Sequence, residues 1–178
     1  MKFTQTSLAD AVLIDLTRLG DERGFFARTF CADTFAKQGL VSVYPQSNAS
    51  QNVKAGTLRG MHFQKAPHAE VKLVRCVKGA LHDVIIDLRP ESPTYMKWEG
   101  FDLTEENGRI LYVPEGFGHG FQTLVDDTHA AYQVSHPYTP GAEGGVRWDD
   151  PAFGVRWPLP VSVISDKDAA WPLDRKSV

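Results

Sequence analysis

Residues 70–88 read EVKLVRCVKGALHDVIIDL, two runs that mix apolar and charged residues on either side of Lys78-Gly79-Ala80. Alternation with a period of two is typical of β-strands, so we expect strands over residues 70–77 and 81–88. A short glycine turn between two such runs predicts a hairpin. Apolar and charged side chains fall on both faces of each run, which indicates that neither face is simply the solvent side.

Three further segments have the composition of short strands. They are residues 109–113, residues 120–124, and residues 129–134 before the turn at Pro137. Several short strands at this spacing predict a β-sandwich or jelly roll.

The helical content is expected to be small. The 15 glycines and 11 prolines leave no segment for a long amphipathic helix. We expect one short helix over residues 33–38, closed by Gly39, and a second opened by Ser165 near Asp168. The sequence therefore predicts an all-β fold with short peripheral helices.

Composition limits the domain count and the kinds of partner. A chain of 178 residues with 42% hydrophobic and 23% charged residues predicts a single domain over residues 1–178. The 19 Lys and Arg against 22 Asp and Glu, a net charge of -3, exclude non-specific capture of nucleic acid or anionic membranes. No apolar run approaches the roughly 20 residues needed to cross a bilayer, the first residues lack the features of a secretory signal, and the two cysteines form no CxxC pair. We expect a cytoplasmic protein.

Side chains suited to acid–base or binding chemistry gather in a few segments. His62 lies in LRGMHFQ, where a glycine permits close approach and Arg59 offers a planar fork for phosphate. His119 lies in the glycine-rich PEGFGHGF, which can present its ring to a cavity or end a strand. The other candidates are Arg23, Gln46, Asn48, Lys72, Asp83, Tyr132 and Asp168. In a β-sandwich these side chains can converge on one cavity.

Taken singly, these candidates also have structural explanations. Tyr132 can pack in a core or deliver a proton inside a dry pocket. Asp168, three residues after Ser165, can belong to a helix cap or can orient a histidine. Lys72 and Asp83 can form an ion pair across the expected hairpin.

Two other kinds of site are disfavoured by spacing. Metal-binding β-barrels carry His-x-His followed a few residues later by Glu, and His62, His68 and Glu70 cannot reproduce that pattern on one strand face. A Gly-x-Ser-x-Gly nucleophile elbow is absent from the sequence. We therefore expect neither a metal nor a serine nucleophile.

An ordered set of motifs closely resembles the dTDP-4-dehydrorhamnose 3,5-epimerase family. The resemblance runs in order over nearly the whole chain. The motifs are DERGFF (21–26), QSN (46–48), LRGMHFQ (58–64), Lys72, DVIIDLR (83–89), SPT (92–94), PEGFGHGF (114–121), Tyr132, WDDP (148–151) and SDKD (165–168).

This resemblance implies a cupin-like double-stranded β-helix, or jelly roll, that needs no metal or other cofactor. It also implies a homodimer completed by exchange of N-terminal strands, and epimerisation of a nucleotide-diphospho-4-keto-6-deoxyhexose. By similarity, His62 is the base, oriented by Asp168, and Tyr132 is the proton donor on the opposite face of the sugar. Lys72 would stabilise the developing enolate.

The same resemblance implies a set of substrate-binding residues. Arg23 and Arg59 would bind the diphosphate, and Tyr138 would lie near the nucleotide. The full set is Arg23, Phe26, Arg28, Gln46, Asn48, Arg59, Asp83, His119, Tyr138 and Glu143.

Arg28 departs from the family pattern, which usually has a glutamate contacting the nucleotide at this position. A carboxylate accepts hydrogen bonds, whereas a guanidinium only donates them. Thymine carries an N–H donor at N3 and cytosine an acceptor, so a CDP-linked substrate is one hypothesis. The alternative is that Arg28 points elsewhere or meets a phosphate.

The sequence favours an enzyme that inverts C3 and C5 of dTDP-4-dehydro-6-deoxyglucose in deoxysugar synthesis. An epimerase acting at C3 or C5 alone fits the same catalytic set. From other classes, a metal-dependent cupin oxygenase and a non-catalytic sugar-binding cupin are the competing interpretations.

Overall fold

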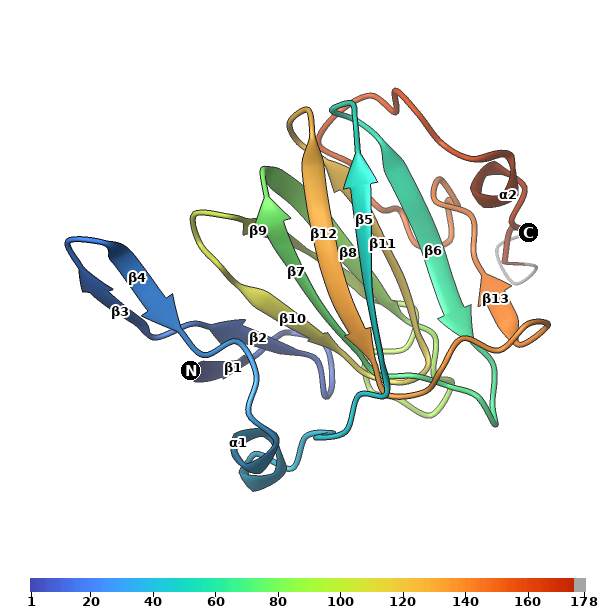
Figure 1. Ribbon diagram of the computed structural model, residues 1–178. Helices are drawn as coiled ribbons and strands as arrows, with labels where there is room; N and C mark the ends of the chain where they lie inside the picture. Colours follow the sequence, from blue (N-terminus) through green and yellow to red (C-terminus); the bar gives the residue numbers. More distant parts are fainter. Residues whose placement is uncertain (175–178) are drawn as a thin grey trace.

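The computed structural model describes residues 1–174 and is built almost entirely of β-strands (Figure 1). Two short helices lie at the periphery. The elements are β1 (Lys2–Gln5), β2 (Val12–Asp15), β3 (Arg18–Asp21), β4 (Gly24–Ala27), α1 (Ala32–Lys37), β5 (Gln46–Asn52), β6 (Leu58–Gln64), β7 (Lys72–Lys78), β8 (Ala80–Asp87), β9 (Trp98–Thr104), β10 (Ile110–Val113), β11 (Phe117–Thr123), β12 (Thr128–Val134), β13 (Glu143–Gly145) and α2 (Asp166–Ala169).

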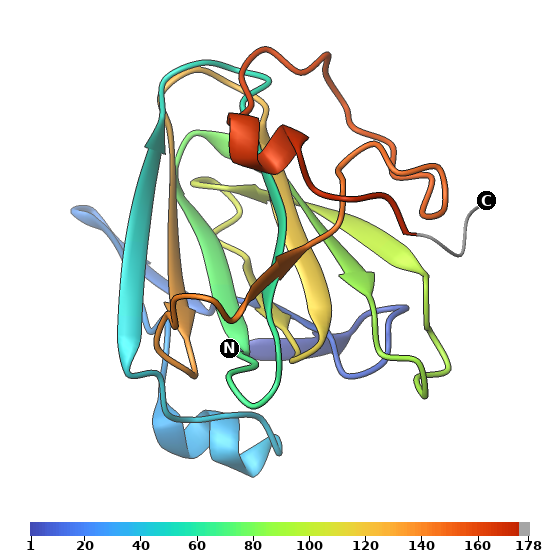
Figure 2. The same cartoon turned by 90° about the vertical axis from the view of Figure 1, so that its right-hand side faces the viewer.

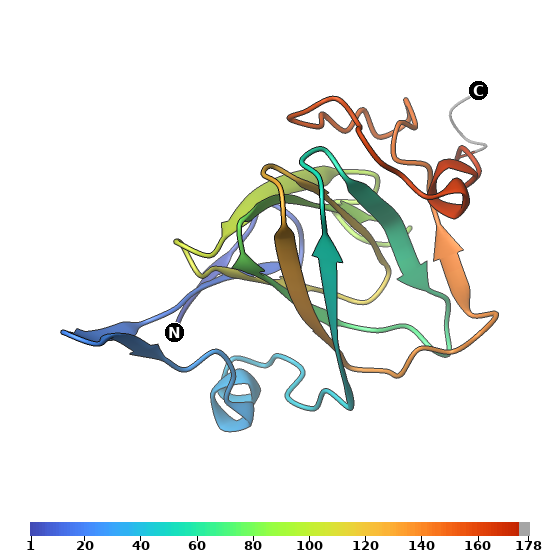
Figure 3. The same ribbon diagram turned by 45° about the horizontal axis from the view of Figure 1, so that its top comes forward.

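Two antiparallel sheets face each other (Figure 3). One has the strand order β1-β2-β10-β7-β12-β5 and the other β13-β6-β11-β8-β9. Fully buried side chains fill the space between them, among them Val74, Leu81, Ile85 and Leu111. This arrangement confirms the predicted all-β, cupin-like jelly roll.

The outer faces of both sheets are covered as well. Phe35 of α1 packs with Ile14 and Leu73 against the six-stranded sheet. Phe153, in the segment after β13, packs with Ile86 on the outer face of the five-stranded sheet. Apolar residues are therefore needed on both faces of β7 and β8, as the mixed pattern of residues 70–88 indicated.

The predicted hairpin of residues 70–88 is wrong, although both of its strands exist. β7 pairs with β10 and β12, whereas β8 pairs with β11 and β9. Gly79, at φ +75°, turns the chain from one sheet into the other. Because both faces of each strand are buried, the residue pattern carries no information about which edge each strand pairs through.

The other predicted elements are confirmed with small shifts of their ends. The strands predicted over residues 109–113, 120–124 and 129–134 correspond to β10, β11 and β12. The helix predicted over residues 33–38 corresponds to α1.

Both predicted helix boundary signals are also present. Gly39 follows α1 at φ +72°. The Ser165 hydroxyl accepts a hydrogen bond of 3.1 Å from the Asp168 N–H and caps α2.

The hairpin of β3 and β4 projects away from the sandwich (Figure 1). Three large apolar residues lie on it with high exposure, Leu19 at 64%, Phe25 at 57% and Phe26 at 65%. At the other side of the molecule, β13 and α2 lie beside β6 (Figure 2). Within residues 1–174, none of the helices has the length and apolar character needed to span a membrane.

Candidate active site

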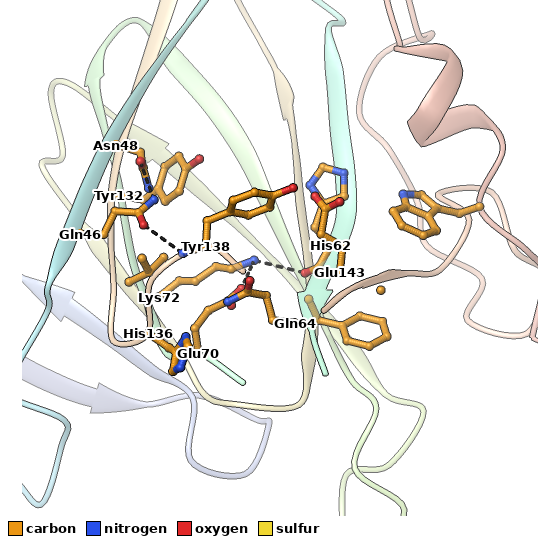
Figure 4. Close-up of a pocket in the computed structure, with 14 residues that line it drawn as sticks. Gln46, Asn48, His62, Gln64, Glu70, Lys72, Tyr132, His136, Tyr138 and Glu143 are labelled. Carbon is orange, nitrogen blue, oxygen red and sulfur yellow. Dashed lines mark hydrogen bonds and ion pairs between the residues drawn. The ribbon is translucent and has the colours of Figure 1, made fainter. Parts of the chain in front are cut away.

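A cavity of about 350 Å³ opens between the two sheets, which is a typical size for a small-molecule site. Its lining comes from β5, β7 and β12 on one side and from β6 and β13 on the other (Figure 4). The lining residues are Gln46, Asn48, His62, Phe63, Gln64, Glu70, Lys72, Tyr132, Val134, His136, Tyr138, Glu143, Gly144 and Trp171.

A second hollow of about 150 Å³ adjoins this cavity. His62, Lys72 and Tyr132 line both spaces, and Arg59 and His119 line the second. The structure thus brings together nine of the predicted residues, namely Gln46, Asn48, Arg59, His62, Lys72, His119, Tyr132, Tyr138 and Glu143, with Asp168 and Asp83 directly behind two of them.

His62 and Asp168 form a dyad at one wall of the cavity. Nε2 of His62 lies 2.6 Å from Oδ1 of Asp168, and Oδ2 accepts a hydrogen bond of 3.1 Å from the Gly60 N–H. An ionised carboxylate only accepts hydrogen bonds, so Nε2 carries the proton and Nδ1 keeps a free lone pair. Nδ1 is therefore the atom of this ring that can act as a base.

Asp168 is buried, yet it stays ionised. Burial alone would raise the pKa of Asp168, but hydrogen bonds from His62 and Gly60 and the charge of a protonated His62 outweigh it and lower that pKa below its usual value. The negative charge of Asp168 therefore lies directly beside the His62 ring, an arrangement that can orient and stabilise an imidazolium.

Tyr132 comes from β12, in the sheet opposite the one that carries His62 (Figure 4). Burial raises the pKa of the Tyr132 phenol, against a smaller opposing effect of Arg59. The phenol therefore carries its proton near neutral pH and can give it to a group bound between the two sheets.

Lys72 places a buried cation in the same cavity. Its Nζ lies 3.2 Å from the carbonyl oxygen of His62 and 3.3 Å from Oε1 of Glu70. Lys72 therefore pairs with Glu70 and not with Asp83, the partner that the sequence analysis considered. Asp83 lies on β8, in the other sheet, and its Oδ2 lies 3.0 Å from Nε2 of His119.

The rim of the cavity is polar. Gln46 donates to Asn48 at 3.0 Å and accepts a hydrogen bond of 2.9 Å from the Tyr138 N–H. Glu143 forms an ion pair of 2.7 Å with Lys167. Tyr138, 53% exposed, stands at the mouth and offers an aromatic face to a ligand.

Arg59 is held in a fixed orientation beside the second hollow. Its Nε donates a hydrogen bond of 2.7 Å to Oδ1 of Asn52. The remaining guanidinium donors suit an anionic group such as a phosphate.

Arg23, Phe26 and Arg28 are not brought to this cavity within their own chain. Arg23 and Phe26 lie on the projecting β3–β4 hairpin, and Arg28 follows it. Arg23 pairs with the neighbouring Asp21 and is otherwise exposed. Local sequence could not show that the hairpin leaves the body of the molecule.

Seven lining residues were not among the predicted site residues: Phe63, Gln64, Glu70, Val134, His136, Gly144 and Trp171. Glu70 and Trp171 are the two of these that contact Lys72 and His62. The Trp171 ring makes an edge contact with the His62 ring, at 6.3 Å between centroids. A Cβ at Gly145 would lie 2.3 Å from Trp171, so the glycine makes room for this indole. For Glu70 a signal existed: residues two apart in an extended chain point to the same side, which places it beside Lys72.

The described part of the chain, residues 1–174, contains no group of three or more His, Cys, Asp or Glu side chains arranged to hold a metal ion.

Comparisons with known proteins agree with this geometry. A family model described as dTDP-4-dehydrorhamnose 3,5-epimerase matches residues 5–175. A dTDP-4-dehydrorhamnose 3,5-epimerase from Sinorhizobium fredii is 45% identical over 173 residues, covering 97% of this chain and 89% of the relative. The crystal structure of such an enzyme from Bacillus anthracis, with TDP and PPi bound, has a TM-score of 0.94 at 41% identity and covers 97% of this chain and 98% of its own.

One relative is named for a narrower reaction. A dTDP-4-dehydrorhamnose 3-epimerase from Streptomyces niveus is 40% identical over 149 residues, covering 83% of this chain and 72% of the relative.

Proposed function

The chain belongs to the dTDP-4-dehydrorhamnose 3,5-epimerase family, and from this premise we propose that it inverts both C3 and C5 of dTDP-4-dehydro-6-deoxyglucose with its own side chains as acid and base. It is an isomerase that acts on a nucleotide sugar. The observation that carries the assignment of roles is the placement of His62 and Tyr132 on opposite sheets around one cavity (Figure 4).

The ketone at C4 of the sugar makes this chemistry accessible without a cofactor. It acidifies the C–H bonds at C3 and C5, because the electron pair left by either proton moves onto the C4 oxygen as an enolate. Nδ1 of His62 takes the proton from one face. The enolate then takes a proton from the Tyr132 phenol on the other face, and the carbon centre is inverted.

This step leaves His62 protonated and Tyr132 as a phenolate. The His62 side chain is 40% exposed, so its proton can pass to solvent. The Tyr132 phenolate takes a proton from solvent before the next inversion, so both residues return to their starting states. Solvent hydrogen therefore enters the product, which makes the reaction visible in deuterated water.

Lys72 stabilises the negative charge that grows on the C4 oxygen. A cation fixed in a dry site before the reaction begins needs no reorganisation as charge develops, and such electrostatic help is often the largest contribution to catalysis. The buried position of Lys72 between the two walls suits this role.

The other end of the substrate lies toward Arg59 and the polar rim. The free donors of the Arg59 guanidinium would bind the diphosphate. Gln46, Asn48, Tyr138 and Glu143 would contact the sugar and the nucleotide.

The projecting β3–β4 hairpin is proposed to complete the site of a second copy in a homodimer with strand exchange. Arg23, Phe26 and Arg28 are remote from the cavity of their own chain, and Phe25, Phe26 and Leu19 are too exposed for an isolated monomer. On a partner, the same hairpin would bring a second arginine to the diphosphate.

Mixing two inactive variants tests this dimer. When Arg23→Ala and His62→Ala chains are unfolded and refolded together, half of the dimers should be heterodimers. Each heterodimer has one intact site out of two, so the mixture should recover about a quarter of wild-type activity. Recovery of no activity, or a monomer by sedimentation, would contradict exchange of the hairpin.

The number of centres inverted is tested by proton NMR in deuterated water with dTDP-4-dehydro-6-deoxyglucose. Deuterium at both C3 and C5 is the expected result. Exchange at C3 alone would give this chain the narrower reaction named for the Streptomyces niveus relative.

Arg28 makes the nucleotide a separate question. If the base is cytosine, CDP should protect the enzyme against heat more than dTDP does. We expect dTDP to be preferred, with Arg28 meeting a phosphate.

We also propose that residues 1–178 form one epimerase domain that works in the cytoplasm, where the free Cys31 and Cys76 would stay reduced.

A further inference from the structure

Glu70 and Lys72 form an ion pair inside the catalytic cavity. Only 7% of the Glu70 side chain and 10% of the Lys72 side chain are exposed, and the two charges are 3.3 Å apart. The His62 carbonyl oxygen accepts a second hydrogen bond from the same Nζ at 3.2 Å. Because an ammonium group has three N–H donors, one remains for a bound ligand.

The second oxygen of Glu70 sets this pair apart from an ordinary salt bridge. Oε2 is buried and has no hydrogen-bond partner among residues 1–174. A buried carboxylate with one unpaired oxygen is costly to keep. The negative charge of Glu70 therefore acts mainly on the Lys72 ammonium group, and it favours the charged form of that group.

Titratable and charged groups from several elements line the two spaces around Lys72. They are Glu70 before β7, Arg59 and His62 on β6, His119 on β11, Tyr132 on β12, His136 and Tyr138 after β12, and Glu143 on β13, with Asp83 on β8 behind His119. Burial lowers the pKa of Lys72, and Glu70 opposes this more than Asp83 does. Asp83 does not contact Lys72: its Oδ2 lies 3.0 Å from Nε2 of His119, and its Oδ1 is buried without a hydrogen-bond partner among residues 1–174. Glu70 is in direct contact with Nζ at 3.3 Å and is therefore the main group that keeps Lys72 charged.

We propose that Glu70 is a positioning residue that holds Lys72 as an ammonium ion aimed at the C4 oxygen of the substrate, and that it thereby extends activity toward alkaline pH. The inference rests on the proposed role of Lys72. Glu70 acts through Lys72, because its Oε1 contacts the Lys72 ammonium group and its Oε2 is buried.

The test compares Glu70→Gln with wild type in kcat and KM between pH 6 and pH 10. Glutamine keeps the size of the side chain and an oxygen acceptor, but it loses the charge. We expect the alkaline fall of kcat to move to lower pH by about one to three units, as for the loss of an opposite charge at this distance. Near pH 6.5 both kcat and KM should stay within a few-fold of wild type.

Two further variants separate this effect from a general structural one. Glu70→Asp keeps the charge on a shorter side chain and should restore most of the alkaline activity. Glu91→Gln, the same substitution at an exposed position, should leave the whole profile unchanged. An equal loss of kcat at every pH for Glu70→Gln would mean a structural role and would overturn the inference.

Lys72→Met distinguishes failure of this inference from failure of the proposed function. If Lys72→Met keeps wild-type kcat, the role proposed for Lys72 is wrong, and that of Glu70 falls with it. If Lys72→Met is strongly impaired while the alkaline limb of Glu70→Gln matches wild type, only the role of Glu70 is refuted.

Discussion

Replacing Asp168 by Asn should suppress proton removal at both carbon centres, because it reverses the tautomer of His62, the residue proposed as the base. In the native site both carboxylate oxygens accept, one from Nε2 of His62 at 2.6 Å and one from the Gly60 N–H at 3.1 Å. Asparagine has one acceptor oxygen. If that oxygen stays with Gly60, the amide NH₂ donates to Nε2, the ring proton moves to Nδ1, and the base is lost.

The opposite orientation of the amide also has a cost. It would place NH₂ against the Gly60 N–H in a buried position, where an unsatisfied donor costs about 1–3 kcal/mol. Either orientation also removes the charge that stabilises the imidazolium. These effects together should raise the activation free energy of proton removal by about 4–5 kcal/mol, which corresponds to a loss of about 10³–10⁴ in rate. An aspartate-to-asparagine change behind a catalytic histidine causes a loss of similar size.

The assay is the rate of deuterium uptake at C3 and at C5, measured separately by NMR. Asp166→Asn, an exposed position on the same short helix, is the matched control and should exchange at the wild-type rate. Because His62 is proposed as the base for both centres, the two rates should fall by the same factor. A loss smaller than about tenfold, or a loss at one centre only, would refute the assignment of His62 as the common base.

Three other changes test separate parts of the structure. Tyr132→Phe keeps the ring but removes the phenol, so it should reduce inversion at one centre at least while deuterium exchange persists; unchanged inversion at both centres would require another donor. Burial would raise the pKa of Asp87, but hydrogen bonds led by that from Arg89 lower it to about 2. This carboxylate therefore adds stability that is present above about pH 4 and lost as the pH falls toward 2. Between these pH values, the free energy of unfolding in urea should fall by about 2 kcal/mol more for the wild type than for Asp87→Asn. A Cβ in Gly120→Ala would lie 2.6 Å from the Met61 sulfur, and calorimetry should show a loss of about 1–3 kcal/mol; an unchanged Tm would argue against close packing of β6 and β11.

Alternation along the chain predicted where strands lie but not how they pair. β7 and β8 begin and end close to the predicted positions. Their pairing was predicted wrongly because a glycine turn serves equally in a hairpin and in a corner between two sheets. The difference lies in the neighbours β10, β12, β11 and β9, which are distant in sequence.

The site shows the same division between local and distant information. Residue types and motifs identified His62, Tyr132 and Lys72 as a set, but the contact between His62 and Asp168 joins residues 106 positions apart. No local sequence pattern could predict this contact. Likewise, nothing in DERGFF shows that Arg23 projects away from the cavity that its own chain forms.

The interleaved strand order also has a consequence for how the protein refolds. β2 pairs with β10, and β5 with β12, so the six-stranded sheet closes only when segments about eighty to one hundred residues apart meet. Such non-local pairing is slow, on the scale of milliseconds to seconds. Since β6, β7, β12 and α2 each contribute one of the residues proposed for catalysis, activity should return only with the slowest phase of refolding, after most of the β-structure has already formed.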